Sequence, residues 1–238
     1  KVKIIKKICK INFNCLLIGF IFMSKINNNI LKLIKYYSLI NYKLILSKKA
    51  LNRYKNFKVG KIEKVDKKLD NLKKLISDVK GCELKKNANN LVFSDGNNKS
   101  KIMIVGEGPG ANEDKEAKPF VGRAGQLLDK MLQAINLSRK NVYITNVVNY
   151  RPPENRKPTE KEIARYLPFL NKHIEIISPK IILLLGSTAL SAVLGDNVVI
   201  SKARGKWYEK KINGRIIHIL PTFHPAFLMR QPDQKKFS

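Results

Sequence analysis

Acidic residues are scarce in this chain of 238 residues. Asp and Glu number 18 against 47 Lys and Arg, which gives a formal net charge of +29 at pH 7. Such a basic excess favours a polyanion as partner, and DNA or RNA is the first candidate. The chain is also rich in Lys, Ile, Asn and Tyr. A biased genome would therefore produce the same excess in the N-terminal third without any binding role.

Cysteine is rare as well. Cys9, Cys15 and Cys82 are irregularly spaced, which indicates neither a disulfide framework nor a zinc site. Their small number fits a protein of the reducing cytoplasm. No internal repeat is visible either, so the sequence does not predict a solenoid or a propeller.

Apolar runs are too short to span a lipid bilayer, which takes ~20 residues. The run at 15–22 follows several lysines, but no small-residue cleavage site comes after it, and Met23 is an ordinary start. We therefore expect residues 1–22 to reflect a start set too far upstream, with a short hydrophobic leader as the alternative. We expect no membrane partner.

Residues 23–80 are predicted to form a basic, partly helical extension. Apolar residues recur at helical spacing among lysines in 26–56, and again in 57–80 after a solvated linker. Nothing in this region indicates chemistry, so a loosely docked appendage is expected. Residues 81–238 have the composition and hydropathy pattern of a folded domain. We therefore assign the biochemical activity of the protein to this part of the chain.

Four apolar runs in that domain are predicted to be strands, at 101–105, 142–148, 180–186 and 215–221. Helices are expected around 127–135, after the capping box Thr159–Glu162, and from Ser187 onward. Strands that alternate with helices predict an α/β fold. The expected architecture is a three-layer α/β/α sandwich with a mainly parallel four-stranded sheet.

Each predicted strand leads to residues that could serve a ligand. Gly106-Glu107-Gly108 follows the first strand, Asn146 lies in the second, Ser187 follows the third and His224 the fourth. Parallel strands end at one edge, so these residues should meet in one crevice. Each has a simpler explanation: a structural turn for the glycines, a clamp for Asn146, an N-cap for Ser187, and a core position for His224. No Lys-Ser/Thr pair completes a phosphate loop, which disfavours a nucleotide-binding enzyme.

Six stretches between Cys82 and Gln231 resemble, in order, motifs of the family 4 uracil-DNA glycosylases. These are G-E-G-P-G-A-N-E-D, K-P-F-V-G-R-A-G-Q-L-L, Y-I-T-N-V-V-N-Y-R-P-P-E-N-R-K-P-T, L-L-L-G-S-T-A, I-S-K-A-R-G-K-W and L-P-T-F-H-P-A-F-L. The resemblance implies a monomeric DNA repair enzyme that flips uracil out of DNA and hydrolyses its N-glycosidic bond, leaving an abasic site.

The resemblance also implies roles for individual residues. Glu107 and His224 would be catalytic: Glu107 would position the water, and His224 would donate to uracil O2 as charge develops there. The uracil-binding set would be Glu107, Gly108, Glu113, Phe120, Asn146 and His224. Within it, Phe120 stacks on the base, Asn146 reads its amide edge and Glu113 excludes the thymine methyl. Phosphate contact or insertion into the DNA stack would fall to Ser187, Arg204, Lys206, Pro225, Ala226, Phe227 and Leu228.

Members of that family hold a four-iron cluster with four cysteines. Of the matching positions only Cys82 is a cysteine, and the other three are Val79, Tyr150 and Tyr166. One thiolate cannot hold a cubane cluster. We therefore expect no cluster, no other cofactor and no metal site.

Two alternatives remain within the superfamily. One is a related glycosylase of altered specificity, and the other is an inactive DNA-binding relative, which the missing cysteines suggest. Relatives that crosslink to the abasic sugar carry an Arg-Arg-Ile-His run after the second strand, which the segment 151–159 lacks. The retained Glu107, Glu113, Phe120, Asn146 and His224 favour an active uracil-DNA glycosylase.

Overall fold

The computed structural model describes residues 65–195, 197–212 and 214–237. The predictions for residues 1–22 and 23–64 lie outside these residues. Within the described part of the chain, no helix combines the length and apolar character that crossing a membrane requires.

The described residues form a six-stranded sheet with the order β1-β3-β2-β4-β6-β5. The strands are β1 (Asp95–Gly96), β2 (Ile102–Gly106), β3 (Tyr143–Asn146), β4 (Ile181–Leu185), β5 (Tyr208–Ile212) and β6 (Arg215–Thr222). The four predicted strands are the central ones and run parallel, so the predicted fold class is confirmed.

Two antiparallel edge strands enlarge the sheet beyond the predicted four. β1 pairs with β3, and β5 pairs with β6. β1 is only two residues long, and β5 reads Y-E-K-K-I with three exposed central residues. Neither carries an apolar run, because an edge strand needs no second buried face and charged side chains protect it from further pairing.

The longer helices are α4 (Val65–Ser77), α7 (Arg123–Ala134), α8 (Glu160–Ile177) and α9 (Ser187–Leu194). The shorter ones are α5 (Glu83–Asn87), α6 (Ala111–Glu116), α10 (Ile200–Ala203) and α11 (Pro225–Arg230). Three 3-10 turns cover Arg139–Asn141, Pro153–Asn155 and Pro232–Phe237. The predicted capping box begins α8: Thr159 N donates to Glu162 Oε2 at 2.7 Å, and Glu162 N donates to Thr159 Oγ1 at 3.3 Å.

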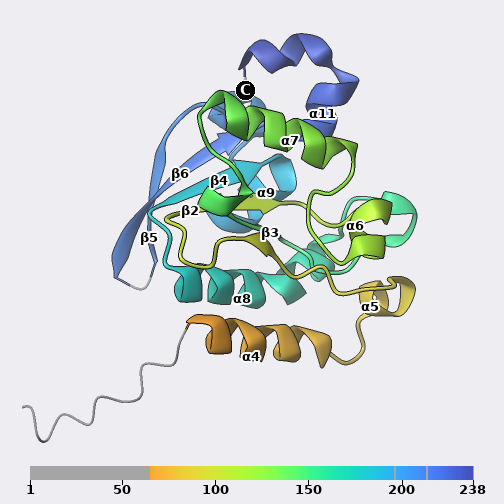
Figure 1. Cartoon of the computed structure of the whole chain (residues 1–238). Coiled ribbons are helices and arrows are strands. Elements are labelled where there is room, and N and C mark those ends of the chain that lie inside the picture. Colours follow the sequence, from red (N-terminus) through yellow and green to blue (C-terminus); the bar gives the residue numbers. More distant parts are fainter. Residues whose placement is uncertain (1–64, 196, 213, 238) are drawn as a thin grey trace, which may run out of the picture. The chain divides into compact units, whose positions relative to one another are not determined.

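Alternate residues of the central strands supply two separate cores. Met103 and Val105 of β2 belong to the core on the α8 and α9 side, whereas Ile104 points to the core under α7. This period of two is what a strand covered on both faces requires. Figure 1 shows the resulting layers, with α7 over one face and α8 under the other.

Helix α4 forms an additional layer beneath α8 (Figure 1). Its buried residues Leu69, Leu72 and Ile76 belong to the same core as Tyr166 and Ile174 of α8. A helix is confirmed within the predicted 57–80 segment. Residues 65–77 nevertheless differ from the expected loose docking, because an amphipathic helix that buries three apolar residues is held by them.

The carboxyl ends of the central strands meet at one edge of the sheet. Gly106 lies opposite Asn146 in the register of β2 and β3. On the other side, Gly186 N donates to Thr222 O at 2.9 Å. The loops that follow β2, β4 and β6 therefore face a common space, as parallel strands dictate.

Candidate active site

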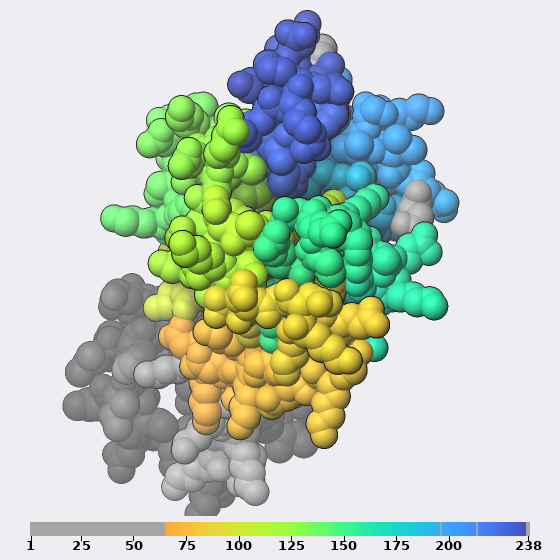
Figure 2. Space-filling model, turned by 90° about the vertical axis from the view of Figure 1, so that its right-hand side faces the viewer, coloured from red at the N-terminus to blue at the C-terminus, as the bar shows by residue number. Residues whose placement is uncertain are grey.

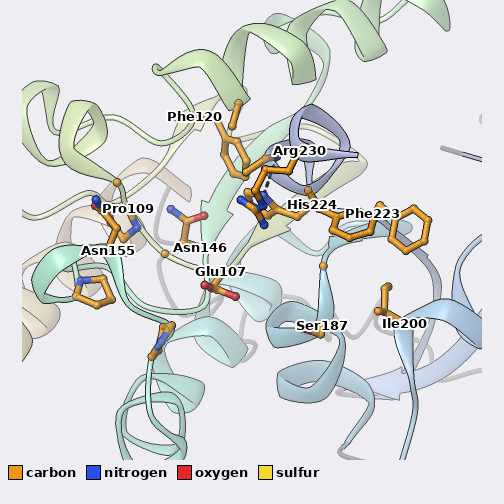
Figure 3. A pocket seen from close by; sticks show the side chains of 18 of the residues that line it. Glu107, Pro109, Phe120, Asn146, Asn155, Ser187, Ile200, Phe223, His224 and Arg230 are labelled. Atoms are coloured by element: carbon orange, nitrogen blue, oxygen red, sulfur yellow. Dashed lines mark hydrogen bonds between the residues drawn. The ribbon is translucent and has the colours of Figure 1, made fainter. Parts of the chain in front are cut away.

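A pocket of about 750 Å³ opens at this edge of the sheet. Nine of the predicted site residues line it: Glu107, Gly108, Glu113, Phe120, Asn146, Ser187, His224, Ala226 and Phe227. Figure 3 shows Glu107, Asn146, Phe120 and His224 around one space, although they come from four separate segments of the chain. The predicted convergence of the strand ends is confirmed.

Glu107 lies in the turn directly after β2. Its Oε2 accepts a hydrogen bond from Thr188 Oγ1 of α9. Thr188 is buried, so a fixed donor orients one carboxylate oxygen. The next residue, Gly108, has no room for a side chain, because a Cβ there would come within 2.7 Å of Val148 Cγ2. The turn is thus held close to β3, with its carboxylate in the pocket.

Asn146 ends β3 and is only 2% exposed. Its Oδ1 has no hydrogen-bond partner within the described protein. Buried amide oxygens are nearly always bonded, because an unpaired one costs about 1–3 kcal/mol. An orphaned acceptor that lines a pocket is the arrangement expected for a group that bonds a ligand's N–H.

Phe120 forms an aromatic wall of the pocket. Its ring centroid lies 5.6 Å from that of His224. A Cβ on Gly106 would come within 2.5 Å of Phe120 Cζ and 2.4 Å of Asn146 Oδ1. Gly106 therefore lets the aromatic ring and the amide approach the same strand end. The pocket has one flat apolar side next to one polar edge, which suits a planar heterocycle.

The backbone of Phe120 is left-handed, with φ at 56°. A non-glycine residue persists there only when its surroundings impose it. Arg139 does so: its Nη2 donates to Phe120 O and its Nη1 donates to Pro119 O at 3.1 Å. Asp95 and Asp129 hold the guanidinium at 2.7 Å and 2.8 Å.

Glu113 lies in the first turn of α6 and lines the pocket. Its carboxylate accepts hydrogen bonds from Gly110 N at 3.1 Å and Gly122 N at 2.8 Å. Both oxygens are therefore engaged, and they connect the turn after β2 to the start of α7. The side chain is held in place before any ligand binds.

His224 is the N-cap of α11, and its Nδ1 accepts from Ala226 N at 3.2 Å. Burial lowers the pKa of His224 from its usual value, against a smaller opposing effect of Glu107. The neutral ring is favoured, and because Nδ1 is an acceptor, the proton belongs on Nε2. A neutral Nε2–H donor results.

Four other predicted residues do not line the pocket. Leu228 and Pro225 lie on the buried side of α11. Lys206 is exposed. The guanidinium carbon of Arg204 lies 5.0 Å from the ring centroid of Phe223, which does line the pocket.

Several residues of the candidate site were not predicted from the sequence. Thr188 and Arg139 act through their contacts with Glu107 and Phe120, and no local pattern signals such contacts. Asn155, Arg156 and Arg230 also line the pocket. The first two lie in the Arg-Pro-Pro-Glu-Asn-Arg stretch. This stretch follows the carboxyl end of β3, a position that could have indicated a place in the pocket.

The four positions that match the cluster ligands lie in the core between α4, α8 and β3. Cys82 Sγ and Tyr166 Oη are 3.2 Å apart and buried. Burial raises the pKa of Tyr166 and of Tyr150, so both phenols stay protonated. Val79 packs against the same core. One thiol, already hydrogen-bonded to a phenol, does not fit an iron–sulfur cluster. No cluster of three or more His, Cys, Asp or Glu ligands exists among the described residues.

Comparison with known proteins identifies the family. Residues 93–238 match the model of the uracil DNA glycosylase superfamily. The type-4 uracil-DNA glycosylase of Sulfurisphaera tokodaii is 44% identical over 173 residues, which cover 71% of this chain and 79% of that protein. The Thermotoga maritima type-4 enzyme is 47% identical over 153 residues, covering 63% and 77%. The one from Saccharolobus solfataricus is 43% identical over 176 residues, covering 71% and 82%. The chain belongs to the uracil-DNA glycosylase superfamily.

Proposed function

We infer that this protein is a uracil-DNA glycosylase of base excision repair. It takes uracil out of the DNA stack and hydrolyses the bond between uracil N1 and the sugar C1′, leaving an abasic site. The observation that carries this assignment is the buried, unpartnered Oδ1 of Asn146 in a pocket with an aromatic wall. The type-4 names of the relatives support the same activity.

The uracil ring binds against Phe120, next to the Asn146 amide at the end of β3. Phe120 stacks on its face, and Asn146 Oδ1 accepts from uracil N3–H while the amide nitrogen donates to O4. Cytosine presents the opposite donor and acceptor pattern at these two atoms, so it leaves both Asn146 groups unpaired. The backbone N–H of Gly108 adds a donor to a carbonyl oxygen of uracil. Glu113, fixed by its two backbone donors, fills the space next to C5 and excludes thymine.

Bond cleavage sends the electron pair of C1′–N1 to the uracil ring and leaves positive charge on the sugar. His224 Nε2–H donates to uracil O2, where negative charge gathers. A neutral ring suits this task because it donates without requiring the active site to bury another cation. Glu107 offsets the charge on the sugar and takes a proton from the water that adds to C1′. Thr188 keeps its carboxylate oriented.

DNA contact is proposed for the rim of the pocket. Ser187 at the exposed start of α9 and Lys206 in the loop before β5 bind phosphates, and Arg204 contributes charge beside Phe223. Ala226 and Phe227 line the pocket, and they are the parts of the Pro225–Leu228 segment that fill the vacated stack. Leu228 has no exposed surface and lies on the buried side of α11, so it stabilises this helix and does not enter the DNA.

The enzyme works without an iron–sulfur cluster. The Cys82–Tyr166 hydrogen bond and the packing of Tyr150 and Val79 support this proposal, because they fill the space between α4, α8 and β3 with protein. Purified protein should contain no stoichiometric iron and no absorbance near 400 nm. A brown preparation with about four irons per chain contradicts it.

The enzyme is proposed to act as a monomer on DNA in the cytoplasm. One chain supplies every residue assigned above, so the chemistry requires no second copy. Sedimentation at micromolar protein concentration tests the monomer, and a sedimentation coefficient of a dimer contradicts it.

One assay tests the activity. A labelled oligonucleotide with a single uracil is incubated with the full chain and then treated with alkali, which breaks the strand at an abasic site. Scission at the uracil is expected. A covalent band indicates a crosslinking relative, and a salt-sensitive gel shift without scission indicates a DNA-binding relative.

Substitution of Asn146 tests the assigned reader. Asn146→Asp should admit cytosine or abolish cleavage, because it replaces the amide donor with a carboxylate oxygen. Asn149→Asp is the matched control, since Asn149 is also buried but bonds the backbone of Val92 and does not line the pocket. Unchanged preference for uracil in Asn146→Asp contradicts the reading role.

A further inference from the structure

The loop that leads into β5 lies at the same edge of the sheet as the pocket. β5 runs antiparallel to β6, with Tyr208 opposite Ile219, so its first residue is near the carboxyl end of β6. Gly205 N donates to Pro221 O at 3.0 Å. Ile200 and Ser201, just ahead of this loop, line the pocket itself. Residues 199–207 are therefore a rim of the pocket.

Trp207 is the most conspicuous residue of this rim. Its side chain is 58% exposed, although the burial of so large an aromatic surface usually contributes strongly to stability. Val199, at the other end of the segment, is 57% exposed. Figure 2 shows the lighter blue part of the chain around residue 200 on the same face as the dark blue C-terminal segment that carries α11. A large aromatic surface is thus presented beside the pocket.

The charge around Trp207 is mostly positive. Five basic residues lie between 199 and 211 against one acid, Glu209: Lys202, Arg204, Lys206, Lys210 and Lys211. Lys202 and Lys206 are exposed. Arg204 lies over Phe223 at 5.0 Å, which joins the rim to the pocket wall. An aromatic plate between ammonium groups is the usual arrangement of single-stranded nucleic-acid sites, where bases stack and phosphates pair with the cations.

We propose that Trp207 stacks on an unpaired base of the strand that carries the uracil, a few nucleotides from the flipped one. A paired base has both faces covered by its neighbours in the helix and cannot offer one to the indole. The rim therefore favours uracil in single-stranded DNA over uracil in a duplex. This inference rests on the proposed function for the identity of the strand, but the stacking itself needs no cleavage.

Fluorescence tests the contact directly, because Trp207 is the only tryptophan in the chain. The full chain is titrated with a uracil-free oligothymidine of about 12 nucleotides, while anisotropy of a labelled end reports binding independently. Quenching that follows the anisotropy curve is expected, with much weaker quenching by a duplex of the same length. Saturated binding with unchanged emission overturns the proposal. Because no uracil is present, this result is independent of glycosylase activity.

Kinetics on uracil-containing DNA provide the second test. Trp207→Ala should raise KM for a single-stranded substrate by roughly 5-fold to 100-fold, the loss typical of one stacked base. KM for the duplex should change less than twofold, and Trp207→Phe should recover most of the loss. Ile216→Ala is the matched control, because Ile216 is a large apolar residue of β6 with 61% exposure. Equal effects of Trp207→Ala on both substrates overturn the proposal.

Discussion

Arg139 Nη2 donates a hydrogen bond to the main-chain oxygen of Phe120, 19 residues earlier in the chain. The same guanidinium pairs with Asp95 and Asp129. It thereby holds Phe120 at a φ of 56°, a backbone conformation that is unfavourable for phenylalanine without such contacts. In the proposed complex, Arg139 is therefore a positioning residue for the wall on which the base stacks.

Replacement of Arg139 by Lys should impair uracil binding more than folding. Lysine keeps the charge but lacks the planar fork that bonds two carbonyls and two carboxylates together. A misplaced Phe120 should lower kcat/KM roughly 10-fold to 100-fold and weaken inhibition by free uracil to a similar extent. A merely structural role would lower the melting temperature and leave the inhibition constant of uracil unchanged. Lys172→Met, which breaks an exposed ion pair with Glu175, is the control and should alter neither.

Gly106→Ala should inactivate the enzyme without unfolding it. A methyl group at this position meets the Asn146 amide and the Phe120 ring, so both must shift from the positions proposed to hold the base. A displacement of about 1 Å costs on the order of 10²-fold in rate. Steady-state kinetics measure the loss, and circular dichroism shows whether the sheet is intact. A variant with native kcat/KM contradicts the proposed position of the base.

His224→Ala should lower kcat by roughly 10²–10³, the loss expected when one oxyanion donor is removed. Binding of uracil-free DNA should be nearly unchanged, as measured by anisotropy. His224→Gln can place a neutral N–H near the same point and should recover part of the loss. Equal rates for the two variants contradict the donor role.

The pH profile checks the charge of His224. Burial lowers its pKa, so the ring remains neutral as the pH falls through the ordinary imidazole range around 6.5. The single-turnover rate should therefore stay level from pH 8 down to that value. A tenfold drop between pH 7.5 and 6.5 that disappears in His224→Gln contradicts a neutral donor with a lowered pKa.

His173 makes folding sensitive to acid. It is 1% exposed, its Nδ1 is 2.9 Å from Tyr143 Oη, and burial lowers its pKa to about 3. The unfolded chain binds a proton near pH 6.5 but the folded chain does not, so stability is lost as the pH falls below that value. The free energy of unfolding should drop by about 2 kcal/mol between pH 7 and pH 5 from this residue alone.

Urea unfolding at the two pH values measures that slope. His173→Phe removes the titrating group and should make the curve flatter by the same amount, although the loss of the Tyr143 contact lowers stability throughout. His218→Phe is the control, since His218 is half exposed. An identical pH dependence in wild type and His173→Phe contradicts the assignment.

The sequence by itself determined the architecture and most of the pocket. Continuous apolar runs such as Ile181–Leu185 indicate parallel strands with both faces covered, and parallel strands bring Glu107, Asn146 and His224 to one edge wherever the loops lead. The edge strands β1 and β5 were missed because they bury too little to need an apolar pattern.

Only the tertiary structure decided how these side chains are held. The contact of Arg139 with Phe120, the bond from Thr188 to Glu107 and the unpaired Oδ1 of Asn146 join residues far apart in the chain. The burial of Leu228 and the exposure of Trp207 were likewise decided by the tertiary structure. Local sequence sets which backbone conformations are favourable, but a side chain's partners and solvent exposure depend on where distant segments pack.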